Sequence, residues 1–276
     1  HYLSKLSNHF GDIIAKCITP GVALGLIIYI DEICPGNPLR PEKGRTLHAI
    51  YWAFTDWPQW LLQRTAAWPC FGTIRSKLVD EFLPGGVSAL MRRIMEVFFV
   101  VSGPSFSKGV ELVHGRDKLL VTAKFCGFLA DEKAQNQICN SKGASGTKCC
   151  ITCNNVFNRV PNQSLVDGAV CLKCTDMLKL RYNTDADVHA FYDHIAAAQL
   201  AGLSPDEYDT MTQMLGIELN PHGLMASLPL RSVYKPVTHC IRDWMHTLVS
   251  HGVANVQCAR VIHMLHSKKV SLETLA

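Results

Sequence analysis

The chain has 276 residues, of which 48% are hydrophobic and 18% are charged, a balance typical of a globular protein with an apolar core. The net charge of +4 is too small to indicate nucleic-acid binding by itself. No apolar run reaches the roughly 20 residues of a membrane-spanning helix, so we expect no membrane partner.

The ends of the sequence suggest a piece of a longer protein. The chain begins at His1 without a methionine and shows no signal peptide. It contains 12 cysteines. In a chain without a secretion signal, closely spaced cysteines favour metal binding over disulfides.

The first part of the chain predicts a sheet. Residues 21–31 are apolar, β-branched and aromatic, which is typical of a buried strand. Residues 46–57 predict a second strand, and 58–68 a third, with a helix as the alternative. The turn-rich links favour an antiparallel meander. The tryptophans of this region are expected to pack in the core: Trp52, Trp57, Trp60 and Trp68.

Helices and strands then alternate. Residues 85–99 carry apolar side chains at the spacing of an amphipathic helix. Residues 117–132 predict a fourth strand that ends in Asp131, and residues 132–140 a short helix. The order strand–strand–strand–helix–strand is that of an RNase H-like α/β fold, a mixed sheet flanked by helices.

The rest of the chain predicts a helical, cysteine-rich insertion and a return to the core. We place the first part of the core at 1–142, the insertion at 143–232, and the C-terminal helices of the core at 233–276. Helices are expected at 185–202, at 204–215 with a capping box, at 238–252, and near 254–266.

Two apolar strands end in carboxylates. Asp31 follows the first predicted strand and Asp131 follows the fourth, and these strands are neighbours in the expected sheet. Two such carboxylates can hold divalent ions that activate water for phosphodiester cleavage. Alternatively, Asp31 is an ordinary turn residue and Asp131 caps the next helix. Glu32 should point to the opposite face because strand side chains alternate, and it is the substitute for Asp31.

A third polar group lies near the C-terminus. If residues 238–252 are helical, His239, Asp243 and His246 share one face, which could line a metal site. The alternative is an exposed amphipathic helix.

Two Cys-x-x-Cys pairs predict a structural zinc site. Cys150 and Cys153 form the first pair, and Cys171 and Cys174 the second, at a spacing that suits four thiolates around Zn²⁺. Cys149 could replace Cys150. The alternative is one pair with scattered free thiols.

Three segments resemble a known family. The segments "YIDEICPGNPL", "FLADEKAQNQICNSKGASGTKCCITCNNV" and "RDWMHTLVSHGV" resemble the catalytic core of eukaryotic cut-and-paste DNA transposases, of the CACTA and Kyakuja–Dileera–Zisupton types, and transposon-derived protist proteins. The resemblance spans about residues 23–255 and implies an RNase H-like (DDE/D) fold.

That resemblance implies a function. Asp31, Asp131 and Asp243 would bind Mg²⁺ or Mn²⁺ for DNA strand cleavage and strand transfer, with His246 near the leaving group or the DNA backbone. Many relatives carry a Glu after the D-x-M-H motif, where this chain has "LVSHGV", so Glu273 is the alternative third acid. The DNA-binding region of such proteins would lie upstream of this sequence.

The partners follow from the same resemblance. We expect DNA, both transposon ends and target, and a nuclear location, with homo-oligomerisation left open. The loop residues Arg40, Lys43 and Arg45 could contact phosphates. A zinc-stabilised binding module that has lost catalysis, and a nuclease without a joining activity, are the alternatives.

Overall fold

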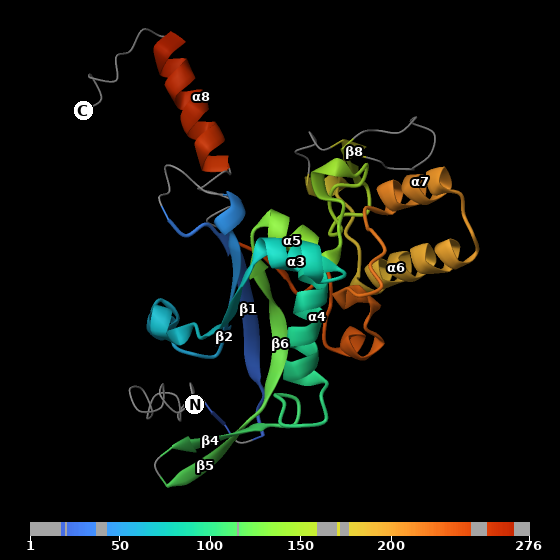
Figure 1. Ribbon diagram of the computed structural model, residues 1–276. Coiled ribbons are helices and arrows are strands. Elements are labelled where there is room, and N and C mark those ends of the chain that lie inside the picture. Colours follow the sequence, from blue (N-terminus) through green and yellow to red (C-terminus); the bar gives the residue numbers. More distant parts are fainter. Residues whose placement is uncertain are drawn as a thin grey trace.

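A five-stranded mixed sheet forms the centre of the molecule (Figure 1). The computed structural model describes residues 18–19, 21–36, 43–114, 116–158, 170–171, 177–243 and 253–267. The strand order is β3-β2-β1-β6-β9. The strands are β1 (Leu24–Ile33), β2 (Leu47–Phe54), β3 (Cys70–Arg75), β6 (Ala123–Ala130) and β9 (Cys240–Arg242).

The sheet contains both antiparallel and parallel pairs of strands. β1, β2 and β3 are consecutive antiparallel neighbours, which confirms the predicted meander, although the link from β2 to β3 contains α2 (Gln59–Leu62). β6 runs parallel to β1, and β9 runs parallel to β6. Because β1, β6 and β9 are parallel, their carboxyl ends lie at the same edge of the sheet.

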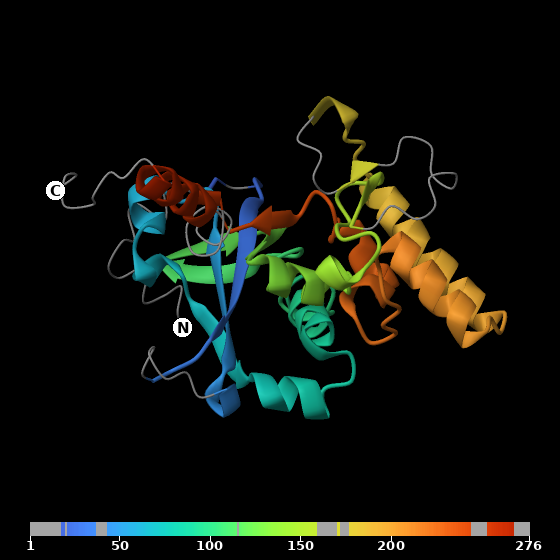
Figure 2. The ribbon, with the colours of Figure 1, turned by 90° about the horizontal axis from the view of Figure 1, so that it is seen from above.

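Helices flank the sheet (Figures 1 and 2). The α-helices of the described ranges are α2 (Gln59–Leu62), α3 (Ser76–Phe82), α4 (Gly86–Phe99), α5 (Glu132–Cys139), α6 (Asp185–Leu200), α7 (Pro205–Leu215) and α8 (Val253–Ser267), of which α8 projects away from the sheet. The apolar stripe of α4 includes Met91, Ile94 and Met95, which are buried in the same core cluster as Leu26 and Ile28 of β1. The molecule is therefore an α/β protein whose core lies between α4, α5 and one face of the sheet.

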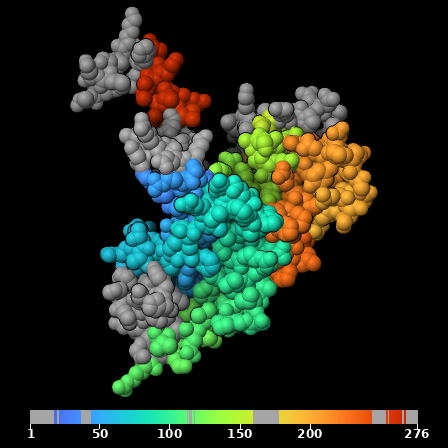
Figure 3. Space-filling view, viewed as in Figure 1, coloured from blue at the N-terminus to red at the C-terminus, as the bar shows by residue number. Residues whose placement is uncertain are grey.

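Two small two-stranded units lie outside the central sheet. β4 (Val110–His114) and β5 (Asp117–Val121) form an antiparallel pair that projects from the body (Figures 1 and 3). β7 (Val156–Phe157) and β8 (Val170–Cys171) form a short parallel pair. The two pairs are additions to the central sheet rather than parts of it.

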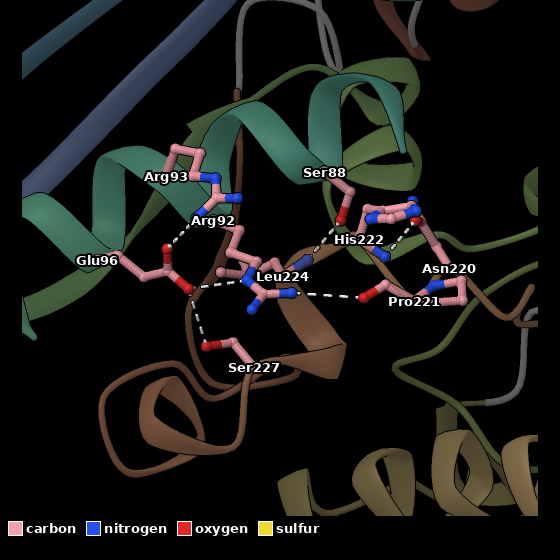
Figure 4. Close-up of polar contacts among 9 residues, drawn as sticks. All are labelled: Ser88, Arg92, Arg93, Glu96, Asn220, Pro221, His222, Leu224 and Ser227. Atoms are coloured by element: carbon pink, nitrogen blue, oxygen red, sulfur yellow. Dashed lines mark hydrogen bonds and ion pairs between the residues drawn. The ribbon is translucent and has the colours of Figure 1, made fainter. Parts of the chain in front are cut away.

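Polar side chains of α4 bind the segment that follows α7 (Figure 4). The hydroxyl of Ser88 accepts a hydrogen bond from the backbone N–H of Leu224 at 2.9 Å. Ser227 donates to Glu96 at 3.3 Å, and Glu96 also binds the guanidinium of Arg92 at 2.8 Å. These contacts fix the segment that leads into β9.

Three sequence predictions differ from the structure. Residues 58–68 contain the single turn α2 and the 3₁₀ turn Thr65–Ala67, so the third strand lies at Cys70–Arg75 instead. Residues 117–132 contain two strands, because β5 pairs with β4 outside the central sheet and β6, after Thr122, pairs with β1 and β9. The segment 238–252 begins with a strand, β9, where a helix was expected.

Other elements agree with prediction. The first two strands, α4, α5 and α8 lie where the periodicity placed them. Ser204 caps α7 with Glu207 in the expected capping box, since each side chain binds the other's backbone N–H. No helix in the described ranges is long and apolar enough to cross a membrane.

A bulge in β6 decides which way its last residues face. Leu26 pairs with Phe125, but the next residue of β1, Ile27, pairs with Gly127, so Cys126 is an extra residue in β6. A one-residue shift moves every later side chain to the other face of a strand. The buried positions of β6 accordingly change phase, from Phe125 to Phe128.

Candidate active site

Asp31 and Asp131 lie at equivalent positions of neighbouring parallel strands. The register pairs Tyr29 of β1 with Leu129 of β6. Asp31 and Asp131 each follow two residues later, so the same register places them side by side. Neighbouring strands are about 4.8 Å apart, and paired positions face the same side of a sheet. The backbones of these two acids are therefore neighbours, as expected.

Asp243 extends this row to β9. The register pairs Ala130 with Arg242, and the next residues are Asp131 and Asp243. The backbone N–H of Asp243 donates to the carbonyl of Ala130 at 3.0 Å. The side chain of Gln135 in α5 donates to carbonyl groups of both β6 and β9, which holds the two strands together.

The hydroxyl of Tyr29 binds one of the three aspartates and feels the negative charge of all three. It donates a hydrogen bond to Oδ2 of Asp31 at 3.2 Å. Burial raises the pKa of Tyr29, and the negative charges of Asp31, Asp243 and Asp131 raise it further. We call Asp31, Asp131 and Asp243 the aspartate row.

The predicted capping role of Asp131 is also real. Its Oδ1 accepts a hydrogen bond from the backbone N–H of Ala134 at 2.7 Å, at the start of α5. This contact uses one carboxylate oxygen and fixes the side chain at the sheet edge. Capping and ligand binding are therefore not exclusive alternatives for this residue.

Glu32 faces away from the aspartate row. It forms an ion pair with Lys133 of α5 and lies opposite His48 in the register. The hydrogen bond from Lys133 lowers the pKa of Glu32, against the raising effect of burial. Asp31 and Glu32 therefore lie on opposite faces of β1, as the alternation of a strand predicted. That Asp31 serves a metal site stays a prediction.

The predicted polar face of His239, Asp243 and His246 is wrong in its geometry. His239 lies in the turn before β9 and is buried, with its ring edge-on to Phe125 at 5.0 Å. Its Nδ1 accepts from the backbone N–H of Lys235 at 3.1 Å. His246 lies outside the described residues, as does Glu273, the alternative third acid. A three-residue strand is too short to leave a periodic signal in the sequence.

The donors of the aspartate row fit a hard divalent cation. Mg²⁺ prefers carboxylate oxygens and needs only one or two of them, because it keeps several waters. Within the described residues, no three His, Cys, Asp or Glu side chains converge closely enough to hold an ion together. The row therefore supplies carboxylates at one edge of the sheet rather than a closed three-ligand cage.

The first cysteine pair lies close to β9. Arg242 donates a hydrogen bond to Sγ of Cys150 at 3.3 Å. The β7–β8 pair brings the backbone of Cys171 beside Phe157, four residues after Cys153. The side chain of Cys171 and all of Cys174 lie outside the described residues.

The structure also shows groups that sequence reasoning missed. A cavity of about 510 Å³ lies beside the aspartate row, and Asp243 forms part of its wall. Aromatic side chains from β1, β2 and the segment after α2 line it: Tyr29, Tyr51 and Trp68. Arg64 lies at its rim and is exposed. Only the aromatic content of this region signals such a pocket in the sequence.

The predicted phosphate contacts are only partly described. Arg45 ends a 3₁₀ turn, Lys43–Arg45, and its side chain is exposed. Arg40 and the side chain of Lys43 lie outside the described residues.

Comparison with protein-family models and with curated proteins found no match to this chain. Its function is therefore inferred from its own residues and their geometry.

Proposed function

We propose that this chain is the RNase H-like core of a transposase-like enzyme that cleaves DNA strands and joins them to target DNA. The observation that carries the proposal is the aspartate row, one carboxylate near the carboxyl end of each of three neighbouring parallel strands. The strand order with β1 between β2 and β6 supports the RNase H-like assignment. The resemblance of the three sequence segments points to the same family.

The row would hold Mg²⁺ or Mn²⁺ through Asp31, Asp131 and Asp243. Such ions activate water and stabilise the leaving oxygen of a phosphodiester. The protein's own part is to fix the carboxylates: Tyr29 holds Asp31 by a hydrogen bond, and the start of α5 holds Asp131. His246 is proposed to act near the leaving group, and Arg40, Lys43 and Arg45 to contact phosphates.

The partners are proposed on the same basis. DNA, as transposon ends and target, would be the substrate, and the protein would act in the nucleus, with self-association into a homo-oligomer. A structural Zn²⁺ would stabilise the cysteine-rich segment, bound by Cys150, Cys153, Cys171 and Cys174. Its role would be structural, because four thiolates leave no open position for catalysis.

Asp131→Asn tests the proposal most sharply. Asparagine caps a helix as well as aspartate does, so the fold should be preserved while the charge is lost. We expect Mg²⁺-dependent nicking of supercoiled DNA to fall at least about 100-fold, because the variant loses an anionic ligand of the ion. The free energy of unfolding, measured by thermal denaturation, should change by less than about 0.5 kcal/mol.

Asp206→Asn is the matched control, because Asp206 is an exposed residue in the first turn of α7. It should cleave at the wild-type rate. Equal cleavage by wild type and Asp131→Asn would remove the aspartate row from the chemistry.

A second function has one observation in its favour. The three acids do not converge into a closed ligand group within the described residues, which suits a protein that kept the fold and lost catalysis. Such a protein would be a zinc-stabilised DNA- or protein-binding module. DNA binding without nicking, in wild type and Asp131→Asn alike, would favour this function. Nicking without joining would instead favour a nuclease.

A further inference from the structure

The cavity beside the aspartate row, which we call the slot, has an aromatic lining that suits contact with a flat ring. The rings of Tyr29 and Tyr51 are stacked, with centroids 6.2 Å apart and planes at 27°. Trp68 stands edge-on to Tyr29, with centroids 6.3 Å apart. All three aromatic side chains are half-buried, and each lines the cavity.

Local contacts hold these aromatic walls in place. The indole N–H of Trp68 donates to the carbonyl of Leu62 at 2.9 Å, which ties the end of the segment 59–68 back to α2. Tyr29 is fixed by its hydrogen bond to Asp31. Tyr51 sits on β2 directly opposite Tyr29 in the antiparallel register. The aromatic side chains are therefore held by the sheet and by the hydrogen-bonded segment 59–68.

Polar residues also line the cavity. Gln63, Arg64 and Thr65 are exposed lining residues. Asp243, the last member of the aspartate row, is a lining residue as well. A ligand in the slot would thus meet both a guanidinium and the carboxylate of Asp243.

We propose that this slot binds one nucleobase that has left the stack of the DNA duplex, next to the phosphodiester held at the aspartate row. Every base presents a π-face, so aromatic walls bind an unstacked base with little dependence on sequence. Arg64 would contact a phosphate on the strand that enters the slot. Trp68 then serves binding, where the sequence alone predicted only core packing. The choice of DNA as the ligand rests on the proposed function.

The probe is a DNA hairpin that carries one unpaired 2-aminopurine in its stem. A second hairpin has an abasic nucleotide at that position. Binding is measured in EDTA, so that no cleavage occurs. We expect the wild-type protein to bind the hairpin with the base roughly 5- to 100-fold more tightly, and to quench the 2-aminopurine fluorescence.

Tyr51→Leu removes one wall of the slot and keeps an apolar side chain on β2. The ratio of the two affinities should fall toward 1 in this variant. Phe71→Leu is the matched control, because Phe71 is an exposed aromatic residue on β3, 46% accessible, and lies outside the cavity lining. It should keep the wild-type ratio. Arg64→Gln, an exposed change, should weaken binding of both hairpins without changing the ratio.

The outcomes separate this proposal from the catalytic one. A wild-type ratio near 1, or a ratio unchanged in a folded Tyr51→Leu protein, would overturn the base slot. Asp131→Asn should keep the wild-type ratio while it loses cleavage. If the ratio is high but Asp131→Asn cleaves normally, the slot stands and the catalytic role of the row fails.

Discussion

At the scale of single residues, Asp31 and Glu32 show how the alternation of a strand divides adjacent charges. Asp31 lies on the face of Tyr29, which donates a hydrogen bond to it. Glu32 lies on the other face, where it is paired with Lys133 of α5. The first acid is therefore available to a site at the sheet edge, and the second joins β1 to α5.

The pH dependence of stability in Glu32→Gln should reveal the structural role of Glu32. The pKa of Glu32 in the folded chain is lowered below its ordinary value of 4.5, chiefly by the hydrogen bond from Lys133. Its contribution to stability is thus present above pH 4.5 and is lost as the pH falls through the folded pKa. We expect the variant to be less stable by about 0.5 kcal/mol at pH 7, since Lys133 is largely exposed, and no less stable near pH 3.

Urea denaturation at the two pH values measures this difference. DNA cleavage by Glu32→Gln should remain at the wild-type level. A large loss of cleavage with unchanged stability would place Glu32, rather than Asp31, in the site.

The residues of the aspartate row could be predicted from the sequence to different degrees. Asp31 and Asp131 each follow an apolar run, which the sequence pattern shows directly, although β1 continues to Ile33. Asp243 was predicted for the wrong reason, because β9 is too short to be distinguished from a helix. Tyr29, Tyr51 and Trp68 were not assigned to the site, since aromatic residues in strands are as typical of a core as of a pocket.

At the scale of elements, the bulge in β6 sets the direction of Asp131. Before the bulge, Phe125 faces the core, and with unbroken alternation Asp131 would face the core as well. The extra residue changes the phase, so that Asp131 shares a face with Leu129 and Tyr29. Gly127 makes this possible with a φ of +155°, in the region that favours glycine.

Gly127→Ala should therefore destabilise the fold. A Cβ at this position would lie 2.9 Å from the carbonyl oxygen of His239 and 2.6 Å from Cδ1 of Ile241. The strained φ and this crowding should together cost about 1–3 kcal/mol of unfolding free energy, as measured in urea.

Gly72→Ala provides the comparison within the same sheet. Gly72 lies in β3, and a Cβ there would meet nothing within 4 Å. Its stability should change by less than about 0.5 kcal/mol. Equal stability of both variants would show that the bulge does not depend on glycine.

At the scale of the whole molecule, the cysteine-rich part shares the core of the sheet, since Ile151, Ile217 and Leu224 belong to the same buried apolar cluster as Leu26 and Ile28 of β1. The hydrogen bond from Arg242 to Cys150 joins it to β9, next to Asp243. α6 and α7 lie to one side of the sheet (Figures 1 and 2). A metal ion that orders this part would thus also support the strand that carries the third acid.

The zinc proposal predicts about one Zn²⁺ per chain in the purified protein, measured by elemental analysis. Cys150→Ser and Cys174→Ser should each lower the zinc content and the melting temperature, because the ion contributes to folding. Removal of the metal with a chelator should lower the melting temperature of the wild type in the same way.

Cys70→Ser is the control, because Cys70 is exposed on β3, at the opposite edge of the sheet from β9. It should leave the zinc content unchanged. A protein that carries no zinc, or variants that bind it as well as the wild type, would contradict the proposal.

The sequence by itself determined the main strands and helices, because burial on one face imposes a period of 2 or 3.6 on the apolar residues. It also identified Asp31, near the end of β1, and Asp131, directly after β6. Only the tertiary structure decided that three aspartates share one row. That arrangement depends on strand order, on a one-residue bulge and on a three-residue strand, and these arise from contacts between residues about 100 positions apart, which no local pattern encodes.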